Sequence, residues 1–568
     1  MEQMENNLRQ AIASEPRSPE AFFSLGLICK STRRPEEAAA FFAQAISLKP
    51  DYAEAYNSLA LVLFSFNRLD QAQECLFRAI EVRADYSEAY NNLGIIQVRL
   101  KLQEEAVESF RQAIRLDPAN PCLLNNLGLA LFGLEYFEDA LDCFRQSVEL
   151  DPDFAEAHYN LGCTLKELKR PSEEIPHYQR AITLNPDYMP AYAKLAVALY
   201  STNRLAEAEI SLRQAINKNP DYADTHRNLG RVLKKMHRLD EAERAFLRAI
   251  EVSTPDQADD ARYGLGILYL LGGQYSKGWK YYDLRRTLFN YPESEFRYWA
   301  GEDLNGRIIL LFCEQGFGDT LQFIRYAAKV AAMAKKTDIR VQPPLQKLLA
   351  AALPECNVYA GLVRPSEYYD YTCSLHSLPL IFQSSETSIP GRKSYLTPPP
   401  HLTQKWGDIL IRLDGGQVPR VGIVWAGNPN HHNDHNRSIP FRLFKKLLDI
   451  EPLTWVSLQV GDRSYDLHQT TRIVFNAAPE LHDYNETAGL VENLDLVITV
   501  DSSAAHLSGA LGKPVWVLLP FAPDWRWQLA REDSPWYESV RLFRQQRIGS
   551  WSEVLQRVRA ELKKFINS

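Results

Sequence analysis

The chain has 568 residues, of which 45% are hydrophobic and 24% charged, a composition typical of folded domains. A net charge of -7 argues against nucleic-acid binding through bulk positive charge. There is no signal pattern at the N-terminus, no apolar run near the ~18 residues of a membrane span, and no metal-binding spacing among the eight cysteines. These features predict several domains in a reduced, cytoplasmic protein without a membrane span or a nucleic-acid partner.

The first half of the chain repeats every 34 residues. Prolines recur at this spacing or twice it, at Pro16, Pro50, Pro118, Pro152, Pro186 and Pro220. Small residues recur in the same frame, at Gly26, Ala60, Gly94, Gly128, Gly162, Ala196, Gly230 and Gly264. Small residues let two helices cross closely, and a proline ends the second helix. The pattern resembles the tetratricopeptide repeat, which implies an all-α superhelix with a concave ligand-binding face.

Seven complete repeats are expected between about residues 19 and 256, and the superhelix is predicted to cover residues 1–290. Residues 1–18 resemble the second helix of a truncated repeat, and a degenerate eighth repeat is expected over 257–290. The fifth repeat has Glu174 where the others have alanine, and Pro176 lies inside its second helix. We therefore expect a local distortion in that repeat.

An asparagine recurs just before the Leu-Gly pair of several repeats, at Asn92, Asn126, Asn160 and Asn228. The resemblance implies that this position lies on the concave surface, where amide groups can bind the backbone of an extended peptide. A polar residue is also tolerated at any solvated position, so both interpretations stay open. The functional one assigns these residues to a protein or peptide partner.

The second half of the chain alternates strands with helices, which implies parallel sheets. We predict a packed, aromatic-rich junction over 291–305, a first lobe over 306–400, a hinge over 401–418, a second lobe over 419–547 and a terminal helix over 548–568. Strands are expected at 307–312, 455–460 and 496–500, and helices at 320–336, 441–450 and near 486–493. Two such lobes place a ligand cleft between them.

Residues 494–514, LDLVITVDSSAAHLSGALGKP, are the most distinctive segment of the second lobe. The apolar strand ends at Asp501, at the edge where open parallel sheets bind their ligands. Ser502 and Ser503 can cap the following helix, whose free N–H groups suit a phosphate. An ordinary strand–turn–helix is the alternative interpretation.

Three segments, EQGFGDTLQFIRY, WAGNPNHHNDHNRSIPF and VDSSAAHLSGALGKP, resemble bacterial heptosyltransferases of the ADP-heptose–lipopolysaccharide type, in glycosyltransferase family 9. The whole chain resembles bacterial proteins that fuse tetratricopeptide repeats to such a domain. The resemblance implies an all-α superhelix followed by a GT-B-like pair of Rossmann-type α/β lobes. It also implies an inverting reaction that needs no metal cofactor and uses a nucleotide diphosphate sugar as co-substrate.

The resemblance assigns roles to particular residues. Asp319, after Gly318, matches the proposed general base, which would take the proton of the acceptor hydroxyl. Capping of a helix that starts at Thr320 is the alternative role for this aspartate. Arg437 matches a basic residue that faces the leaving diphosphate, where an arginine can bind phosphate through two nitrogens.

Three further residues, Asp501, Ser502 and His506, match an Asp-Thr-Gly…His stretch near the donor, and Ser503 lies within the same stretch. Ser503 replaces the glycine, which bears on how closely backbone N–H groups approach a phosphate. His506 lies on a helix rich in alanine and leucine, so a buried core histidine is the alternative.

Two loops complete the predicted cleft. The cluster His431, His432, Asp434 and His435 invites a metal interpretation, but we favour a polar loop that closes on a nucleotide sugar, since no element fixes a tetrahedral ligand set there. Residues 520–527, PFAPDWRW, are expected to pack between the lobes, with Asp524 and Arg526 able to reach the cleft.

The predicted function is transfer of a sugar from a nucleotide diphosphate sugar to an acceptor hydroxyl, on a protein presented by the repeats. The nucleocytoplasmic O-GlcNAc transferases, which join similar repeats to a GT-B domain, suggest the same use of the repeats by analogy. The alternative is a scaffold whose GT-B domain has lost its activity.

Overall fold

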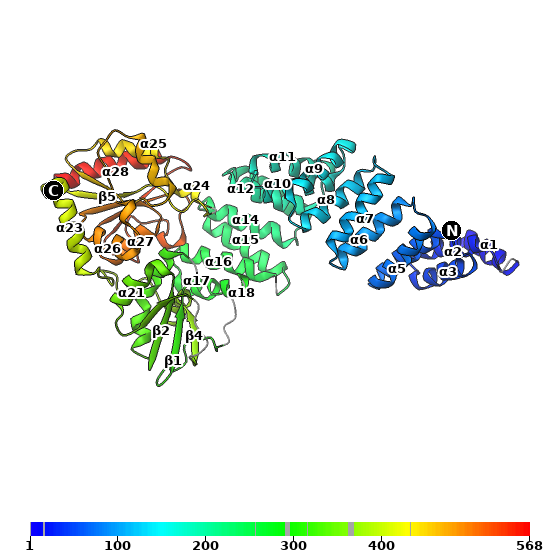
Figure 1. The fold of residues 1–568 in the computed structure, drawn as a ribbon, viewed down its shortest axis with the longest axis horizontal. Helices are drawn as coiled ribbons and strands as arrows, with labels where there is room; N and C mark the ends of the chain where they lie inside the picture. The colour runs from blue at the N-terminus through cyan, green and yellow to red at the C-terminus, as the bar shows by residue number, and fades with distance from the viewer. Residues whose placement is uncertain are drawn as a thin grey trace. The chain divides into compact units, whose positions relative to one another are not determined.

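The computed structural model describes residues 2–14, 17–255, 257–289, 296–314, 316–361, 368–431 and 433–567, so Pro16 of the predicted repeat lies outside the described residues. The chain forms two compact units, residues 1–228 and 229–568. The first consists of helices, and the second contains the last helices of the repeat array together with two parallel sheets (Figure 1). The sequence placed the boundary at residue 290. The division into units at 229 is a different boundary, because helices of the repeat array continue to residue 288. Residues of these helices, such as Leu239 and Leu270, share a core with the sheets.

Helix pairs of 13 and 14 residues fill the chain from residue 19 to residue 252. They are α2 (Pro19–Ser31) and α3 (Pro35–Leu48), α4 (Ala53–Ser65) and α5 (Leu69–Val82), α6 (Ser87–Arg99) and α7 (Gln103–Leu116), α8 (Pro121–Gly133) and α9 (Phe137–Leu150), α10 (Ala155–Glu167) and α11 (Pro171–Leu184), α12 (Met189–Ser201) and α13 (Leu205–Lys218), and α14 (Ala223–Lys235) and α15 (Leu239–Val252). A single helix, α1 (Glu2–Ser14), precedes them, and α16 (Ala258–Leu271), the shorter α17 (Tyr275–Tyr282) and α18 (Arg285–Leu288) follow. The tetratricopeptide repeats are therefore present, with a single helix before them and a shortened pair after them.

The recurring glycine of the first helices faces an aromatic ring sixteen positions later. A Cβ atom at Gly94 would lie 2.6 Å from the ring of Phe110, so only a residue without a side chain fits. The same approach occurs at Gly26, Gly128, Gly162 and Gly230. Where the position holds Ala60, the residue sixteen positions later is Leu76. The sizes of the residues at these two positions therefore compensate each other between repeats. Glycine is paired with an aromatic residue, and alanine with the smaller leucine.

The fifth repeat differs from the others in its core. Helix α11 continues through Pro176 from Pro171 to Leu184. Glu174 occupies the alanine position and is only 3% exposed, and its Oε2 has no hydrogen-bond partner among the described residues. Burial raises the pKa of Glu174 to about 7. The departure from the repeat pattern thus takes the form of a buried carboxyl group rather than a broken helix.

Two parallel sheets form the second half of the chain. The first has the order β3-β2-β1-β4, with β1 (Ile308–Phe312), β2 (Lys336–Val341), β3 (Asn357–Ala360) and β4 (Tyr371–Ser374). The second has the order β10-β9-β8-β5-β6-β7, with β5 (Arg420–Val424), β6 (Thr454–Ser457), β7 (Phe475–Asn476), β8 (Leu496–Val500), β9 (Val515–Leu519) and β10 (Val540–Arg544). Counted within each lobe, the strands run 3-2-1-4 and 3-2-1-4-5-6. In this doubly wound order the ligand crevice lies where the first and fourth strands end.

Some elements of the lobes differ from the sequence prediction. The helix predicted over 320–336 is instead α19 (Phe317–Phe323), a 3-10 turn and α20 (Ala327–Ala331), and β2 has already begun at Lys336. At the break, Arg325 Nε donates to the carbonyl oxygen of Gln322 at 3.0 Å. The helix predicted over 441–450 is likewise short, because α25 (Phe441–Phe444) continues as a 3-10 helix. The strand Leu496–Val500 and the terminal helix α28 (Trp551–Ile566) lie where the sequence predicts them.

A helix occupies most of the predicted hinge at 401–418. It is α23 (Pro400–Asp414), which begins with a proline at its first position. Leu402, Trp406 and Leu410 lie on one helix face and are buried. The Trp406 indole donates to Glu486 of α26 (Tyr484–Glu492) at 2.8 Å. This segment is therefore packed on the second lobe rather than extended as a free joint.

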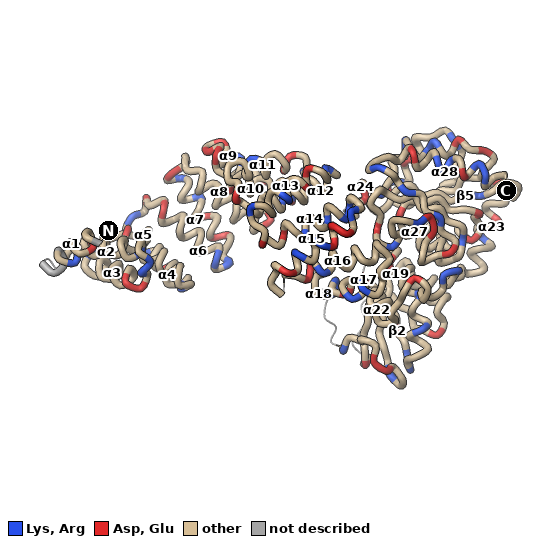
Figure 2. The backbone as a smooth tube through the Cα atoms, turned by 180° about the vertical axis from the view of Figure 1, so that it is seen from behind, with Lys and Arg blue, Asp and Glu red and all other residues tan. Residues whose placement is uncertain are grey.

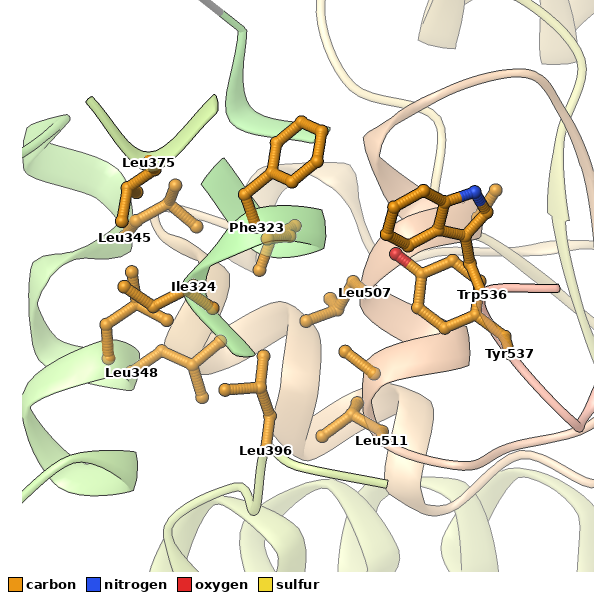
Figure 3. Packing of buried hydrophobic residues seen from close by; sticks show 14 of the residues in the cluster. Phe323, Ile324, Leu345, Leu348, Leu375, Leu396, Leu507, Leu511, Trp536 and Tyr537 are labelled. Atoms are coloured by element: carbon orange, nitrogen blue, oxygen red, sulfur yellow. The ribbon is translucent and has the colours of Figure 1, made fainter. Parts of the chain in front are cut away.

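One continuous core joins the last helices of the array to both lobes. Trp279 of α17 lies 5.4 Å from Trp525, and its indole donates to the carbonyl oxygen of Ser384 at 2.8 Å. Figure 3 shows Phe323 of the first lobe on one side of this core and Leu507 and Trp536 of the second on the other. The junction before the first lobe is thus packed, although residues 291–295 lie outside the described part.

Basic and acidic residues alternate along the described backbone, with Lys and Arg in blue and Asp and Glu in red (Figure 2). Among the described residues, no helix is long and apolar enough to cross a membrane. All eight cysteines are free thiols.

Candidate functional site

The segments that follow the carboxyl ends of β1 and β8 approach each other through two helices. Helix α19 follows β1, and α27 (Ser503–Ala510) follows β8. The helices approach so closely that a Cβ atom at Gly318 would lie 2.8 Å from Cδ2 of His506. Gly318 therefore serves the contact between the lobes. This contact brings together the loop after the first strand of one sheet and the turn after the fourth strand of the other.

Asp319 is the third residue of α19 and lies at this contact, with its side chain 18% exposed. Its Oδ2 accepts a hydrogen bond from the Gly316 backbone N–H at 3.1 Å, and its Oδ1 is paired with the guanidinium of Arg526. Burial raises the pKa of Asp319 although Arg526 opposes the change. The helix begins at Phe317 rather than Thr320, so Asp319 lies inside the first turn. From there its carboxylate accepts the hydrogen bond of the residue that precedes the helix, Gly316.

Arg526 bridges the two lobes from a 3-10 turn, Trp525–Trp527, in the loop after β9. Besides Asp319, its guanidinium donates to Asp524 Oδ1 at 2.7 Å and to Gln322 Oε1 at 2.6 Å. Although burial opposes it, Arg526 holds the pKa of Asp524 below its usual value. The loop thus packs between the lobes and also supplies a buried cation to the cleft.

Asp501 and Arg437 lie within electrostatic range of each other in the second lobe. The guanidinium of Arg437, in α24 (Asp434–Arg437), lies 2.6 Å from where a Cβ of Gly427 would be, just beyond the end of β5. Burial, helped by the charge of Asp524, raises the pKa of Asp501 to about 6, and Arg437 opposes the rise. A carboxyl with that pKa changes charge near neutral pH, beside the arginine predicted to face a diphosphate.

The serines of the turn do not cap α27 as the sequence suggested. Ser502 takes the capping position in the backbone, but its hydroxyl lies 2.9 Å from Thr499 Oγ1. Ser503 Oγ accepts a hydrogen bond from the Tyr484 hydroxyl at 2.7 Å. Within the described part of the chain, neither hydroxyl binds an N–H group of α27, because each is used by a neighbouring side chain.

His506 lies in the core between the lobes. Its Nδ1 is 2.9 Å from the Tyr537 hydroxyl, and its ring stacks on Trp527 at 5.3 Å. Burial lowers its pKa to about 3, so the ring is neutral. This environment matches the core interpretation of His506, and its predicted contact with the donor stays a prediction.

Sequence reasoning missed a buried arginine that the repeat array contributes to the site. Arg285 of α18 donates to Glu314, Nε to Oε2 at 2.8 Å and Nη2 to Oε1 at 3.0 Å, and also to the Ser377 hydroxyl at 2.8 Å. Glu314 follows β1, and Ser377 follows β4. The only sequence signal was Glu314 itself, a carboxylate just beyond a buried strand.

His376 was missed as well. It lies in the turn after β4, is 1% exposed, and its Nε2 is 4.0 Å from Asp319 Oδ1. Neither ring nitrogen has a hydrogen-bond partner among the described residues. The ends of the first and fourth strands of the first sheet thus place an aspartate and a histidine side by side.

The predicted asparagines link consecutive repeats. The amide nitrogens of Asn92, Asn126 and Asn160 donate to the side-chain oxygens of Asn57, Asn91 and Asn125 at 2.8, 2.8 and 2.9 Å, and Asn228 donates to the Ala193 carbonyl at 3.5 Å. The two bonded residues are 35 positions apart in the sequence in each case, one more than the 34-residue repeat. These amides therefore have a structural role, and their binding of a peptide stays a prediction.

The histidine-rich loop after β5 is bonded internally. His431 Nδ1 accepts from the Asn433 N–H at 3.2 Å, and Asp434 pairs with Arg437 at 3.3 Å and with the Ser438 hydroxyl at 2.7 Å. His432 lies outside the described residues. Where the chain is described, no three His, Cys, Asp or Glu side chains gather as metal ligands.

Comparison with family models identifies the repeats. Models described as tetratricopeptide or TPR repeats match residues 5–53, 31–93, 103–135, 136–169, 155–188, 175–224 and 227–285. A relative, Protein FlbA of Caulobacter vibrioides, is 25% identical over 347 residues. That match covers 56% of this chain and 57% of FlbA, so the chain spans little more than half of its relative.

Solved structures resemble the repeat portion. YrrB, described as a TPR protein with an unusual peptide-binding site, is 23% identical, covers 32% of this chain and 95% of its own, and has a TM-score of 0.29. PilF of Pseudomonas aeruginosa is 21% identical, with coverages of 35% and 91% and a TM-score of 0.33. The Cut9–Hcn1 hetero-tetramer is 18% identical, with coverages of 41% and 46% and a TM-score of 0.36.

Proposed function

We propose that this tetratricopeptide-repeat chain is an inverting, metal-independent glycosyltransferase with a GT-B-like pair of lobes. It transfers a sugar from a nucleotide diphosphate sugar to an acceptor hydroxyl. The observation that carries the proposal is the meeting of the two ligand-binding edges at one ion pair, Asp319 with Arg526. Two doubly wound sheets that face each other in this way favour a ligand that spans both crevices.

In the proposed reaction the acceptor oxygen attacks the anomeric carbon while the bond from that carbon to the diphosphate breaks. The electron pair of the broken bond leaves with the diphosphate, and the hydroxyl proton moves to Asp319. A buried carboxylate with a raised pKa suits this proton transfer. Arg437 and the N-terminal N–H groups of α27 stabilise the departing diphosphate.

The repeats present the acceptor, which we propose is a protein. A superhelix of helix pairs offers an extended concave face, and we propose that the asparagine series Asn92, Asn126, Asn160 and Asn228 lies along it. Eight free thiols and a nucleotide sugar substrate favour the cytoplasm as the compartment.

A scaffold with an inactive GT-B domain is the second candidate, and two observations favour it. Asp319 is already occupied, by Arg526 on one oxygen and by Gly316 on the other. In addition, a continuous core joins the lobes through residues such as Phe323 and Leu507. Both features suit a fixed assembly whose repeats bind partners.

A thermal-shift screen separates the two functions. The full chain is melted with UDP-, GDP-, ADP- and CMP-linked sugars, and a ligand that binds the folded state raises Tm by mass action. We expect one nucleotide class to raise Tm in the wild type and in Asp319→Asn, while Asp319→Asn alone loses release of the nucleoside diphosphate. Asp533→Asn, at an exposed aspartate paired with Arg531, is the matched control and should keep both properties. No shift with any nucleotide would favour the scaffold.

A further inference from the structure

His376 is a buried polar side chain without a partner of its own. Its ring is 1% exposed, packs against Phe323 at 4.9 Å, and has both nitrogens unbonded among the described residues. Buried polar groups in folded proteins are nearly always hydrogen-bonded, so an unbonded imidazole requires an explanation. A histidine in this position does little for packing that an apolar residue would not do better.

Asp319 Oδ1 is a hydrogen-bond acceptor 4.0 Å from Nε2 of this ring. That distance is too long for a direct hydrogen bond. The same Oδ1 is held by Arg526, whereas Oδ2 is bonded to the Gly316 N–H. Arg526 and His376 therefore both approach Asp319 Oδ1, and Arg526 is the one bonded to it.

The charges around the ring keep it neutral. Burial lowers the pKa of His376 well below its usual value, and the guanidinium groups of Arg285 and Arg526 add to the effect. A neutral imidazole with a proton on Nε2 is a hydrogen-bond donor to a carboxylate. It can thus replace Arg526 at Asp319 without cancelling the negative charge that a base needs.

The position of Arg526 would let a second anion compete with Asp319 for its guanidinium. Arg526 lies within electrostatic range of Asp501 as well as Asp319, so it stands between the crevices of both sheets. An arginine binds a phosphate as readily as a carboxylate, because both present the paired oxygens that fit its planar fork. A diphosphate that enters between the lobes competes with Asp319 for this guanidinium.

We infer that His376 is the positioning residue of Asp319, and that it takes Oδ1 over from Arg526 when a diphosphate group binds Arg526. The inference rests on the proposed function and adds two residues to it, Arg526 as a diphosphate ligand and His376 as the donor that orients the base. Before the donor binds, the ion pair keeps Asp319 from accepting a proton. Binding of the donor releases Asp319, so the base becomes available only when the sugar is in place.

The test observes His376 directly and needs no acceptor. The full chain is labelled with ¹⁵N-histidine, and the His376 ring signals are assigned by their loss in His376→Gln. Inorganic pyrophosphate is then added in the presence of a chelator, with sodium chloride at equal ionic strength as the control. We expect pyrophosphate to move the His376 Nε2 signal toward a hydrogen-bonded donor in the wild type, and to leave it unchanged in Asp319→Asn.

A second variant reproduces the release without a ligand. Arg526→Gln removes the competing cation, and we expect the same change in the His376 signal, which Asp319→Asn in the same chain abolishes. Circular dichroism checks its folding, and if Arg526→Gln does not fold, the pyrophosphate experiment on the wild type decides alone. A His376 signal that pyrophosphate leaves unchanged, or that changes equally in Asp319→Asn, overturns the inference. The glycosyltransferase proposal fails separately, through the absence of any nucleotide-dependent rise in Tm.

Discussion

The guanidinium of Arg285 at the end of the repeat array is bonded through two nitrogens to the carboxylate of Glu314 in the first lobe, at 2.8 and 3.0 Å. Their side chains are 0% and 1% exposed. Glu314 lies between β1 and α19, the helix that carries Asp319. The last helix of the array is therefore bonded to the segment that leads into the candidate site. A change in Arg285 or Glu314 should affect both the end of the array and the first lobe.

Replacement of Arg285 by methionine should destabilise the second unit strongly. Removal of one partner of a buried ion pair leaves an uncompensated charge, which costs about 3 to 5 kcal/mol. We expect Arg285→Met to lower the free energy of unfolding by that amount, measured by urea denaturation of the full chain. Arg285→Met combined with Glu314→Leu should recover much of the loss, because no buried charge remains.

The matched control for this ion pair is Arg297→Ala. Arg297 pairs with Glu302 at 2.7 Å, but its side chain is 68% exposed. Its loss should change stability by no more than about 0.5 kcal/mol. If Arg285→Met and Arg297→Ala had equal effects, Arg285 would not be the buried link that the structure shows.

The glycine and aromatic positions of a repeat should behave as one unit. Gly94→Ala overpacks the site against Phe110, and Phe110→Leu leaves a cavity, so each single change should destabilise the array by about 1 to 3 kcal/mol. The double variant recreates the Ala60 and Leu76 combination of the second repeat. It should be more stable than the sum of the single effects by at least about 1 kcal/mol, measured as a double-mutant cycle in urea. Strictly additive effects on stability would show that the sizes of the residues at these two positions do not compensate each other.

Glu174 should make the stability of the array depend on pH. Its pKa is about 7 in the folded chain, against an ordinary value of 4.5. Between these values the folded state holds a proton that the unfolded chain has released, so the free energy of unfolding falls as pH rises. Above pH 7 the loss amounts to about 2 to 3 kcal/mol.

Glu174→Ala should remove this loss and restore the residue common to the other repeats. We expect its Tm to exceed that of the wild type clearly at pH 8 and much less at pH 5. Glu174→Gln has nearly the same volume and no charge, so it should remove the same pH dependence. The ring nitrogens of His158 and His177 lie 3.2 Å apart, and these two residues titrate in every variant, so their effect cancels in the differences. An equal Tm difference at both pH values would contradict a buried, ionisable Glu174.

Sequence patterns located the repeats and several strands because these depend on local periodicity. The 34-residue spacing of prolines and small residues needs no knowledge of tertiary contacts, and the run Leu496–Val500 is apolar at every position but Thr499. The same patterns did not identify the helix within residues 401–418, which were assigned to a hinge, although Leu402, Trp406 and Leu410 share one buried helix face.

The contacts of the site could not be predicted in the same way. Asp319, His376 and Arg526 are separated by 57 and 150 positions along the chain: the fold of the first lobe brings the first two together, and the packing of the two lobes adds Arg526. Arg285 appeared as one of two adjacent arginines in a junction, and nothing local distinguishes it from the half-exposed Arg286. An arginine such as Arg285 becomes part of the site because it lies against an opposite charge. Which charge it lies against is decided by tertiary contacts, not by the local sequence.

Arg437 should bind a diphosphate. It lies against Gly427 near the end of β5, within electrostatic range of Asp501, and its guanidinium is already paired with Asp434 at 3.3 Å. A charge-assisted hydrogen bond contributes about 1.5 to 3 kcal/mol, so Arg437→Ala should weaken pyrophosphate binding by about tenfold to a hundredfold, measured by calorimetry. Arg437→Lys keeps the charge but loses the planar fork, and should fall between the wild type and the alanine variant.

Arg442→Ala provides the comparison for Arg437, since Arg442 is an exposed arginine five residues further along the chain. It should leave pyrophosphate affinity unchanged, because any general effect of positive charge on the anion is screened at physiological salt. Loss of Arg437 also leaves the buried Asp434 with the Ser438 hydroxyl as its remaining side-chain partner, so the Tm of each variant must be measured alongside. Equal affinities of Arg437→Ala and Arg442→Ala, with unchanged Tm, would remove Arg437 from the diphosphate site and leave Arg526 and the start of α27 to hold it.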